Sequence, residues 1–475
     1  MDNHQHSIVV VGGGINGLAA AWSAWLSSGE GRARVTLLEA SDAVGGKART
    51  RHLDGYLFEE GPTGYLSGEA TLDRLIELAG LEALPARQEA ARRYVVRGNR
   101  VRQIKSHPLA FARSGILSLG GLLRIAREPW VRRTQAAEES VWHFAQRRLG
   151  TQAADRLIAP MVLGVWAGDA KRLSLPSAFP RMAEMEREHG SLIRAMIHLQ
   201  KSRKSHGGPA GPAGHLHSFA AGMQSLPLAL AERAPFEVRC HAAVNELRRE
   251  DPCAPWQVHV AGSDSPMAAD QVILACEPHV SSKLLAPTLP EVARELADLQ
   301  IPGVAVVALA YPAGTNFPVG FGALIPRDEG YRTLGVLFDS QLFAGRSPQN
   351  SVLVRCLIGG STDLEAASLP SEELAQLAAQ ELGRLFRISE VPRTVACKRH
   401  TTAIPQYELG HAQRLERMDQ SFVRAGDRVR GLHLSGCHRA GVAFGKTAAE
   451  GWRLGKLAGE AQTGWNPPLT GTAKS

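Results

Sequence analysis

A glycine-rich turn near the N-terminus has the spacing of a phosphate-binding loop. Gly12, Gly14 and Gly17 follow the apolar run SIVVV in a G-x-G-x-x-G pattern. The first glycine permits a tight turn, the second lets a phosphate approach the backbone, and the third allows close packing of helix against strand. The helix that begins after the loop would direct free N–H groups at the phosphate. The pattern therefore predicts a nucleotide-binding loop.

A carboxylate follows at the distance typical of a ribose contact. The second apolar run, RVTLLEA, ends with Glu39 and Ala40, and Glu39 lies 22 residues after Gly17. A carboxylate there binds a ribose diol and repels a 2′-phosphate, so NADP is not expected. The alternative interpretation is an ordinary glycine turn beside a surface glutamate.

Further glycine segments favour FAD over NAD. The segment EASDAVGGKART places Gly45, Gly46 and Lys47 just after the acidic residue, and FEEGPTGY follows it. Far along the chain, GLHLSGCHRAGVAFGKTAAEG repeats the order strand, glycine, helix, with a helix N-terminus expected near Val442. The free N–H groups of that second helix could face a flavin or a pyrophosphate. NAD enzymes seldom need such a distant element.

Length and composition indicate how these segments are organised. At 475 residues, with 44% hydrophobic and 21% charged residues, the chain is expected to form two or three globular units. Its six cysteines form no C-x-x-C pair, which favours a reduced, cytoplasmic protein. No metal site is expected, because His206, His215 and His217 lie in a Gly/Pro-rich stretch without a supporting carboxylate.

The charge pattern limits the classes of binding partner that the protein is expected to have. A formal net charge of +8 suits nucleic acid, an anionic membrane or an anionic substrate, but no nucleic-acid motif occurs and nucleic acid is not expected. The uncharged stretch 299–326 contains four prolines, so no transmembrane segment is predicted. Residues 90–127 hold nine basic and no acidic residues, and 108–127 is otherwise apolar. That stretch either lies on an anionic bilayer or packs on the protein, and both remain open.

Together these segments resemble the flavin amine oxidase superfamily. HAAVNELRRE and DQVILACEP are similar to its middle FAD segment, which places Val244 at the adenine and Ala275 near the pyrophosphate. With the glycine motifs, the resemblance implies a non-covalent FAD held by Gly12, Gly14, Ile15, Asn16, Gly17, Glu39, Ala40, Gly45, Gly46, Lys47, Gly61, Pro62, Thr63, Val244, Ala275, Gly436, Val442 and Ala443.

Three stretches narrow the resemblance to the protoporphyrinogen oxidase family, over nearly the whole chain. They are LIAPMVLGVWAGDAKRLSLPSAFP, FGALIPRDEGYRTLGVLF and AIPQYELGH. The implied fold is α/β, with a discontinuous Rossmann-like FAD-binding domain, a substrate domain on a mixed sheet and a helical insert. The boundaries expected are 1–85, 215–300 and 425–465 for FAD, 86–107 and 301–424 for substrate, 108–214 for a membrane-associated insert with a linker, and 466–475 for a disordered tail.

The resemblance also carries over substrate positions. Arg93 falls where an arginine meets a propionate, and a guanidinium suits a carboxylate because it donates two parallel hydrogen bonds. Gly164 falls where a backbone carbonyl approaches the macrocycle. Leu324 and Leu337 match leucines that sandwich one ring, and Leu357 stands where plant members have phenylalanine. The family's Gly-Asn is Gly436-Cys437 here, so Cys437 is not an expected flavin contact.

The implied activity is FAD-dependent oxidation of protoporphyrinogen IX to protoporphyrin IX, a step of heme biosynthesis. FAD would take hydride from a meso carbon and oxygen would reoxidise it, in three cycles. No catalytic side chain is expected, because the C–H bond is already activated. Two alternatives remain: oxidation of coproporphyrinogen III to coproporphyrin III, and a non-catalytic flavoprotein that binds a tetrapyrrole. The expected location is cytoplasmic, peripheral to the cytoplasmic membrane, and a homodimer or a contact with ferrochelatase is left open.

Overall fold

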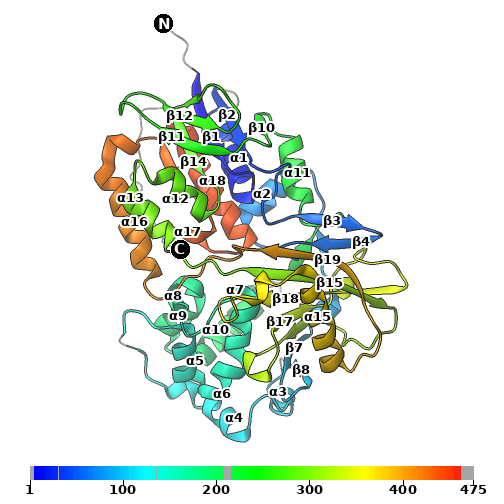
Figure 1. The fold of residues 1–475 in the computed structure, drawn as a ribbon. Coiled ribbons are helices and arrows are strands. Elements are labelled where there is room, and N and C mark those ends of the chain that lie inside the picture. Colours follow the sequence, from blue (N-terminus) through cyan, green and yellow to red (C-terminus); the bar gives the residue numbers. More distant parts are fainter. Residues whose placement is uncertain (1–4, 30–31, 106, 135, 207–214, 462–475) are drawn as a thin grey trace.

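The computed structural model describes residues 5–29, 32–105, 107–134, 136–206 and 215–461. The sequence predicts an irregular connector over 201–218, but a helix runs to His206 and a short strand covers Leu216–Ser218, so that prediction is wrong at both ends. Its middle, 207–214, and the expected tail at 466–475 lie outside the described residues. Two large sheets lie one above the other in Figure 1, and a helical region lies below the upper sheet and beside the lower one. The predicted mixed α/β fold is therefore confirmed.

The upper sheet is parallel throughout and has the order β10-β2-β1-β14-β20. Its strands are β1 (His6–Val11), β2 (Ala33–Leu38), β10 (Glu237–Arg239), β14 (Gln271–Leu274) and β20 (Leu432–Leu434). The central strand β1 is buried on both faces, as its continuous β-branched run predicts. Three distant parts of the chain thus build one sheet.

A stripe of glycines joins the two helices that cover this sheet. Helix α18 (Phe444–Glu460) packs along α1 (Ile15–Ser27). A Cβ on Gly451 would lie 2.0 Å from the carbonyl oxygen of Asn16, and one on Gly455 would lie 2.0 Å from that of Ala20. Glycine at every fourth position lets the two backbones touch, and Asn16 donates through Nδ2 to the Thr447 carbonyl at 2.7 Å. The first and last thirds of the chain are therefore locked together.

The lower sheet is mixed and has the order β19-β15-β18-β17-β16-β7-β8. Its strands are β7 (Arg93–Val96), β8 (Val101–Ile104), β15 (Val304–Pro312), β16 (Gly322–Leu324), β17 (Thr333–Leu337), β18 (Ser351–Gly359) and β19 (Arg393–His400). Only the β16–β7 pair is parallel among these neighbours. Helix α15 (Ser371–Phe386) covers one face through Leu374, Ala378 and Leu382. The other face is free to line a site.

Smaller elements complete the two sheet regions. Short strands are β3 (Thr50–Leu53), β4 (Tyr56–Glu59), β5 (Tyr65–Leu66), β6 (Leu84–Pro85), β9 (Leu216–Ser218), β11 (Val244–Arg248), β12 (Trp256–Val260) and β13 (Met267–Ala269). The further helices are α2 (Ala70–Ala79), α11 (Ser225–Glu232), α12 (Pro278–Leu285), α13 (Pro290–Ala297), α14 (Asp339–Leu342), α16 (His411–Ala425) and α17 (Cys437–Ala440).

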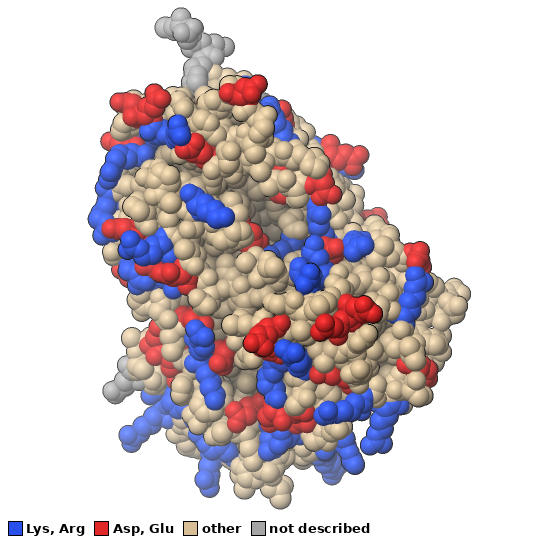
Figure 2. Space-filling view, viewed as in Figure 1, with Lys and Arg blue, Asp and Glu red and all other residues tan. Residues whose placement is uncertain are grey.

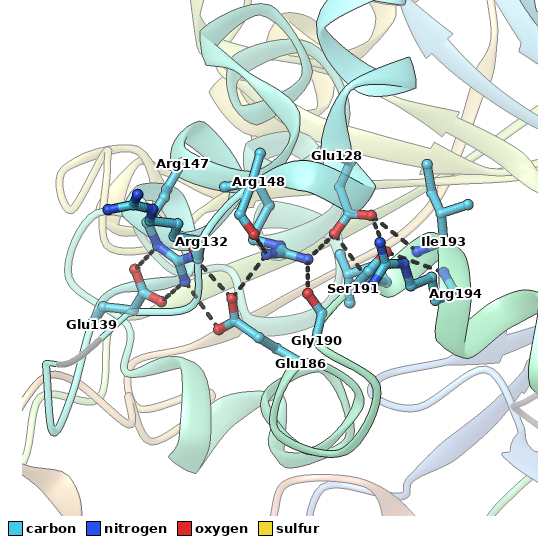
Figure 3. Close-up of polar contacts among 12 residues, drawn as sticks. Glu128, Arg132, Glu139, Arg147, Arg148, Glu186, Gly190, Ser191, Ile193 and Arg194 are labelled. Atoms are coloured by element: carbon cyan, nitrogen blue, oxygen red, sulfur yellow. Dashed lines mark hydrogen bonds and ion pairs between the residues drawn. The ribbon is translucent and has the colours of Figure 1, made fainter.

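The helical region is held by a buried ion-pair network (Figure 3). Its helices are α3 (Pro108–Ala112), α4 (Leu119–Ala126), α5 (Val141–Leu149), α6 (Thr151–Ala153), α7 (Ala159–Trp166), α8 (Leu175–Ala178), α9 (Pro180–His189) and α10 (Leu192–His206). Arg148 and Glu128 form an ion pair with no exposed side-chain surface. Glu128 also accepts from the amides of Leu192 and Ile193 at 2.9 and 3.2 Å, which satisfies the N-terminus of α10. Across the described ranges, no helix has the length and apolar character needed to cross a membrane.

Candidate active site

A cavity of about 790 Å³ lies where the two sheets meet. Its walls come from the N-terminal glycine loop, the loop after β4, the middle and C-terminal FAD segments, α7 and the lower sheet. Sixteen of the predicted cofactor residues line it: Gly12, Gly14, Ile15, Asn16, Glu39, Ala40, Gly45, Gly46, Lys47, Gly61, Pro62, Thr63, Val244, Ala275, Gly436 and Val442. Gly17 and Ala443 are not among its lining residues.

The three glycines of the first loop differ in what surrounds them. Gly12 has a φ of +112°, which a residue with a side chain rarely adopts. A Cβ on Gly17 would lie 1.8 Å from the carbonyl oxygen of Gly12, so this glycine serves the packing of the turn. A Cβ on Gly14 would meet no protein atom within 4 Å. Gly14 is thus the glycine that leaves room for a ligand.

Glu39 stands at the end of β2 with its carboxylate held at the cavity wall. One oxygen, Oε2, accepts from the Gly13 amide at 2.6 Å, and the other accepts from the Ser41 amide at 2.8 Å. These bonds fix the carboxylate at the carboxyl edge of the parallel sheet, where a nucleotide ribose binds in folds of this kind. The helix N-terminus, the open space at Gly14 and the carboxylate together fit one end of a dinucleotide.

The C-terminal helix begins slightly later than expected. Gly436 and Gly441 both have positive φ, at 142° and 105°, so the chain turns twice before α18 starts at Phe444. The short helix α17 occupies the residues between them. Val442, where the start was expected, lines the cavity as part of this turn.

Cys437 lines the cavity at the start of α17. Burial raises the pKa of its thiol to about 11, although the nearby Lys47 ammonium opposes the shift. The group is therefore a neutral thiol near pH 7 and not a nucleophilic thiolate.

The lower sheet and α7 supply an apolar end to the cavity. Gly164, Leu337 and Leu357 line it, together with Val304, Val306 and Leu334. Leu324 does not line the cavity but packs behind Gly164. Four of the five residues expected at the macrocycle therefore lie at or directly behind one wall.

Arg93 lies outside that wall. Its side chain is exposed, and its guanidinium carbon is 5.4 Å from the centroid of the Phe321 ring. Phe321 itself lines the cavity. Since strand β7 pairs with β16 so that Arg93 faces Gly322, the arginine stands beside the cavity rim, one side chain away from the interior.

Sequence reasoning missed a polar group on the cavity wall. Lys47 Nζ lies 2.7 Å from Glu277 Oε1 and donates to the Ala403 carbonyl at 2.7 Å. His400 bonds through Nε2 to the Glu60 carbonyl at 2.7 Å, and burial lowers its pKa, which favours the neutral ring. Neither Glu277 nor His400 belongs to a sequence motif that could have indicated its role. They come close to Lys47 only in the folded protein, where the middle segment and β19 lie beside the first glycine loops.

Comparisons with known proteins agree with this architecture. The model of the flavin containing amine oxidoreductase family matches residues 15–457, and the chain belongs to that family. It is 30% identical to protoporphyrinogen oxidase 1 of Spinacia oleracea, over 92% of this chain and 81% of that protein. It is 26% identical to coproporphyrinogen III oxidase of Bacillus subtilis, over 93% and 95%. A crystal structure from Exiguobacterium sp. 255-15 shares the fold, with a TM-score of 0.82, 23% identity and coverage of 96% and 98%.

Family membership confirms the predicted flavin cofactor and the predicted oxidoreductase class. It supports an enzyme over the alternative of a non-catalytic flavoprotein that binds a tetrapyrrole. The cavity also fits a flavin nucleotide, because the residues predicted to bind the nucleotide surround one end and an apolar wall closes the other.

Proposed function

We propose that the protein oxidises protoporphyrinogen IX to protoporphyrin IX. The observation that carries the proposal is the single cavity in which the nucleotide-binding residues meet the apolar wall of Gly164, Leu337 and Leu357. A flat, largely apolar macrocycle suits such a wall. The names of the plant relatives point to the same substrate.

The chain's own residues would position and enclose the substrate. The leucines and α7 would hold the macrocycle and exclude water, while the neutral His400, the buried thiol of Cys437 and the Lys47–Glu277 pair form the polar part of the wall. When bound, FAD would supply the two-electron oxidation of an activated C–H bond, with oxygen as the final acceptor. Six electrons leave the macrocycle, which requires three rounds. No side chain at the wall has to act as a nucleophile.

Coproporphyrinogen III is a second candidate substrate. The observation that favours it is the likeness to the Bacillus subtilis enzyme, which spans 95% of that protein. The two porphyrinogens differ in the number of propionates. The larger number of carboxylates on coproporphyrinogen would need more cations at the rim than Arg93 alone.

Parallel assays of the purified protein test the proposal. Porphyrin fluorescence is followed with each porphyrinogen at matched concentrations in air, with boiled protein as the control for spontaneous oxidation. We expect a higher kcat/KM with protoporphyrinogen IX. A higher kcat/KM with coproporphyrinogen III would show that this porphyrinogen is the substrate. If neither porphyrinogen gives fluorescence above the control, both assignments are refuted.

We also propose that the helical region rests on an anionic membrane surface. Leu119, Leu123 and Trp130 are 81%, 65% and 77% exposed around α4. Exposed arginines lie among them: Arg113, Arg127, Arg132 and Arg133. Figure 2 shows lysine and arginine side chains projecting from the end of the molecule where Figure 1 places α4 and α6. Exposed apolar side chains that share one segment with exposed cations suit a bilayer interface.

A further inference from the structure

Arg355 is buried between the lower sheet and the cofactor loop. It lies in β18, its side chain is 1% exposed, and it forms an ion pair with Asp339, which is 4% exposed. Nε and Nη2 both bond to the Asp339 carboxylate, the second at 3.1 Å. The pair thus joins β18 to α14, which begins two residues after Leu337.

The remaining donors of Arg355 reach the loop after β4. Nη1 donates to the carbonyl oxygens of Glu59 and Gly61, at 2.6 and 3.3 Å, and Nη2 donates to Oγ1 of Thr63 at 2.6 Å. With the two bonds to Asp339, all five N–H groups of the guanidinium have a partner. Lysine has three donors on a single nitrogen and could not keep this set.

These contacts join the two halves of the cavity wall. Gly61 and Thr63 line the cavity on the cofactor side. Leu357, two residues along β18 from Arg355, lines it on the substrate side, and Leu337 is the register partner of Arg355 on β17. A single buried side chain therefore ties the cofactor loop to both strands that carry the wall leucines.

We propose that Arg355 is a positioning residue, which sets the cofactor loop 59–63 against the substrate wall through the Arg355–Asp339 pair. The inference rests on the flavin site of the family and on the substrate wall, and not on which porphyrinogen is oxidised. If this is so, loss of the Arg355 guanidinium and its hydrogen bonds weakens FAD binding and misplaces the cofactor relative to the substrate.

The molecule contains a matched pair for comparison. Arg148 and Glu128 in Figure 3 are likewise a fully buried ion pair, and Arg148 also donates to the carbonyls of Val131 and Gly190 at 2.9 and 2.7 Å, although its Nε has no hydrogen-bond partner among the described residues. Neither residue lines the cavity. Breaking either pair should lower stability to a similar degree, because each leaves a buried charge unpaired. Only the Arg355–Asp339 pair should affect the flavin.

The test compares Arg355→Lys with Arg148→Lys in the full-length holoprotein. The measurements are thermal stability, the dissociation constant of FAD from titration of the apoprotein, the visible flavin spectrum, and kcat and KM at saturating FAD. We expect both variants to melt at lower temperature. Arg355→Lys should bind FAD about tenfold more weakly, since charge-assisted hydrogen bonds are lost. Its kcat should fall about tenfold or more even when loaded, because small displacements of reacting groups are costly.

Arg148→Lys should keep the FAD dissociation constant and the spectrum of the wild type. The proposal is overturned if Arg355→Lys matches Arg148→Lys in both flavin measurements, since the pair would then be structural only. If Arg355→Lys does not fold, the same flavin measurements are made on Asp339→Asn, with Glu128→Gln as its control. The proposal is then overturned if these two variants do not differ in FAD affinity and flavin spectrum. The FAD titration does not involve porphyrinogen, so it separates a failure here from a failure of the proposed activity.

Discussion

The backbone of Gly164 packs directly on the side chain of Leu324: a Cβ on Gly164 would lie 2.3 Å from Cδ2 of the leucine. Gly164 belongs to α7 and Leu324 to β16, so the contact joins the helical region to the lower sheet. Gly164 faces the cavity while Leu324 stands behind it. A side chain at position 164 would have to displace the end of the Leu324 side chain or shift the helix.

Gly164→Ala should therefore damage the substrate wall without touching the nucleotide loop. Overpacking of this kind costs about 1–3 kcal/mol, and we expect kcat/KM for porphyrinogen to fall roughly tenfold while the FAD content stays unchanged. Steady-state kinetics and the flavin-to-protein absorbance ratio measure the two effects. Adding Leu324→Ala should recover part of the loss, because the shorter side chain makes room. Strict additivity of the two changes would contradict the proposed contact.

Much of the nucleotide end could be predicted because its signals are local. The turn at Gly12 and the packing at Gly17 follow from the spacing of glycines after one buried strand. The repetition of strand, glycine and helix near both ends of the chain indicates nucleotide-binding units, while the rest of the expected α/β fold is implied by the resemblance to the flavin amine oxidase superfamily. Each of the local features needs only a few neighbouring residues to specify it.

The polar contacts across the cavity could not be predicted in the same way. Arg355 resembles any other arginine on a strand, and its role depends on a loop 292 residues earlier, at Thr63. Glu277 likewise follows a predicted cofactor residue, Ala275, but meets Lys47 only through the tertiary fold. The glycine stripe of α18 is regular in sequence, yet its partner helix α1 cannot be identified from that stripe alone.

Two glycines of the first loop should respond differently to substitution. Gly14 has a φ of −69° and open space around it, so Gly14→Val should fold normally but lose most of its FAD, because the side chain fills the space left for phosphate. Gly17→Ala should instead lower thermal stability, since its Cβ would meet the Gly12 carbonyl oxygen. The flavin absorbance gives the FAD content of each variant, and thermal melting gives its stability. Full FAD content in Gly14→Val would remove the loop from the cofactor site.

The flavin should be released intact when the protein is denatured. Because burial raises the pKa of Cys437 to about 11, only about one molecule in a thousand carries the thiolate at pH 8. A neutral thiol does not form a covalent bond to the flavin ring. After acid precipitation we expect all flavin in the supernatant, and Cys437→Ser should hold the same amount of FAD as the wild type. Protein-bound flavin fluorescence that disappears in Cys437→Ser would show a covalent link.

Binding to membranes should depend on the exposed residues around α4. The double change Leu119→Glu with Trp130→Ser removes two side chains that are 81% and 77% exposed, so the folded protein should lose little stability. We expect the wild type to float with anionic vesicles, less at high salt, and the double variant to stay behind. Val391→Glu, at an 89% exposed position outside the helical region, is the matched control. Equal flotation of all three proteins would exclude this surface.

The rim position of Arg93 suggests how a propionate would be recognised. Its guanidinium rests on the Phe321 ring, which limits the conformations of a side chain that is otherwise exposed. The neighbouring Arg97 is not a suitable comparison, because it already pairs with Asp328 and Glu329 at 3.0 and 3.1 Å. Arg100 is exposed and lies on the turn between β7 and β8, so it offers the same charge without the ring contact.

Arg93→Ala should raise KM for porphyrinogen by roughly tenfold to a hundredfold, which corresponds to about 1.5–3 kcal/mol for a lost charge-assisted hydrogen bond. Because the propionate lies away from the reacting carbon, kcat should fall less than KM rises. Arg93→Lys should have an intermediate effect, since lysine keeps the charge but not the planar fork. Arg100→Ala should change KM by less than about twofold, because an exposed charge contributes only to the general field. If Arg93→Ala and Arg100→Ala have the same small effect in steady-state assays at one salt concentration, Arg93 does not hold the propionate and the anchor lies elsewhere on the rim.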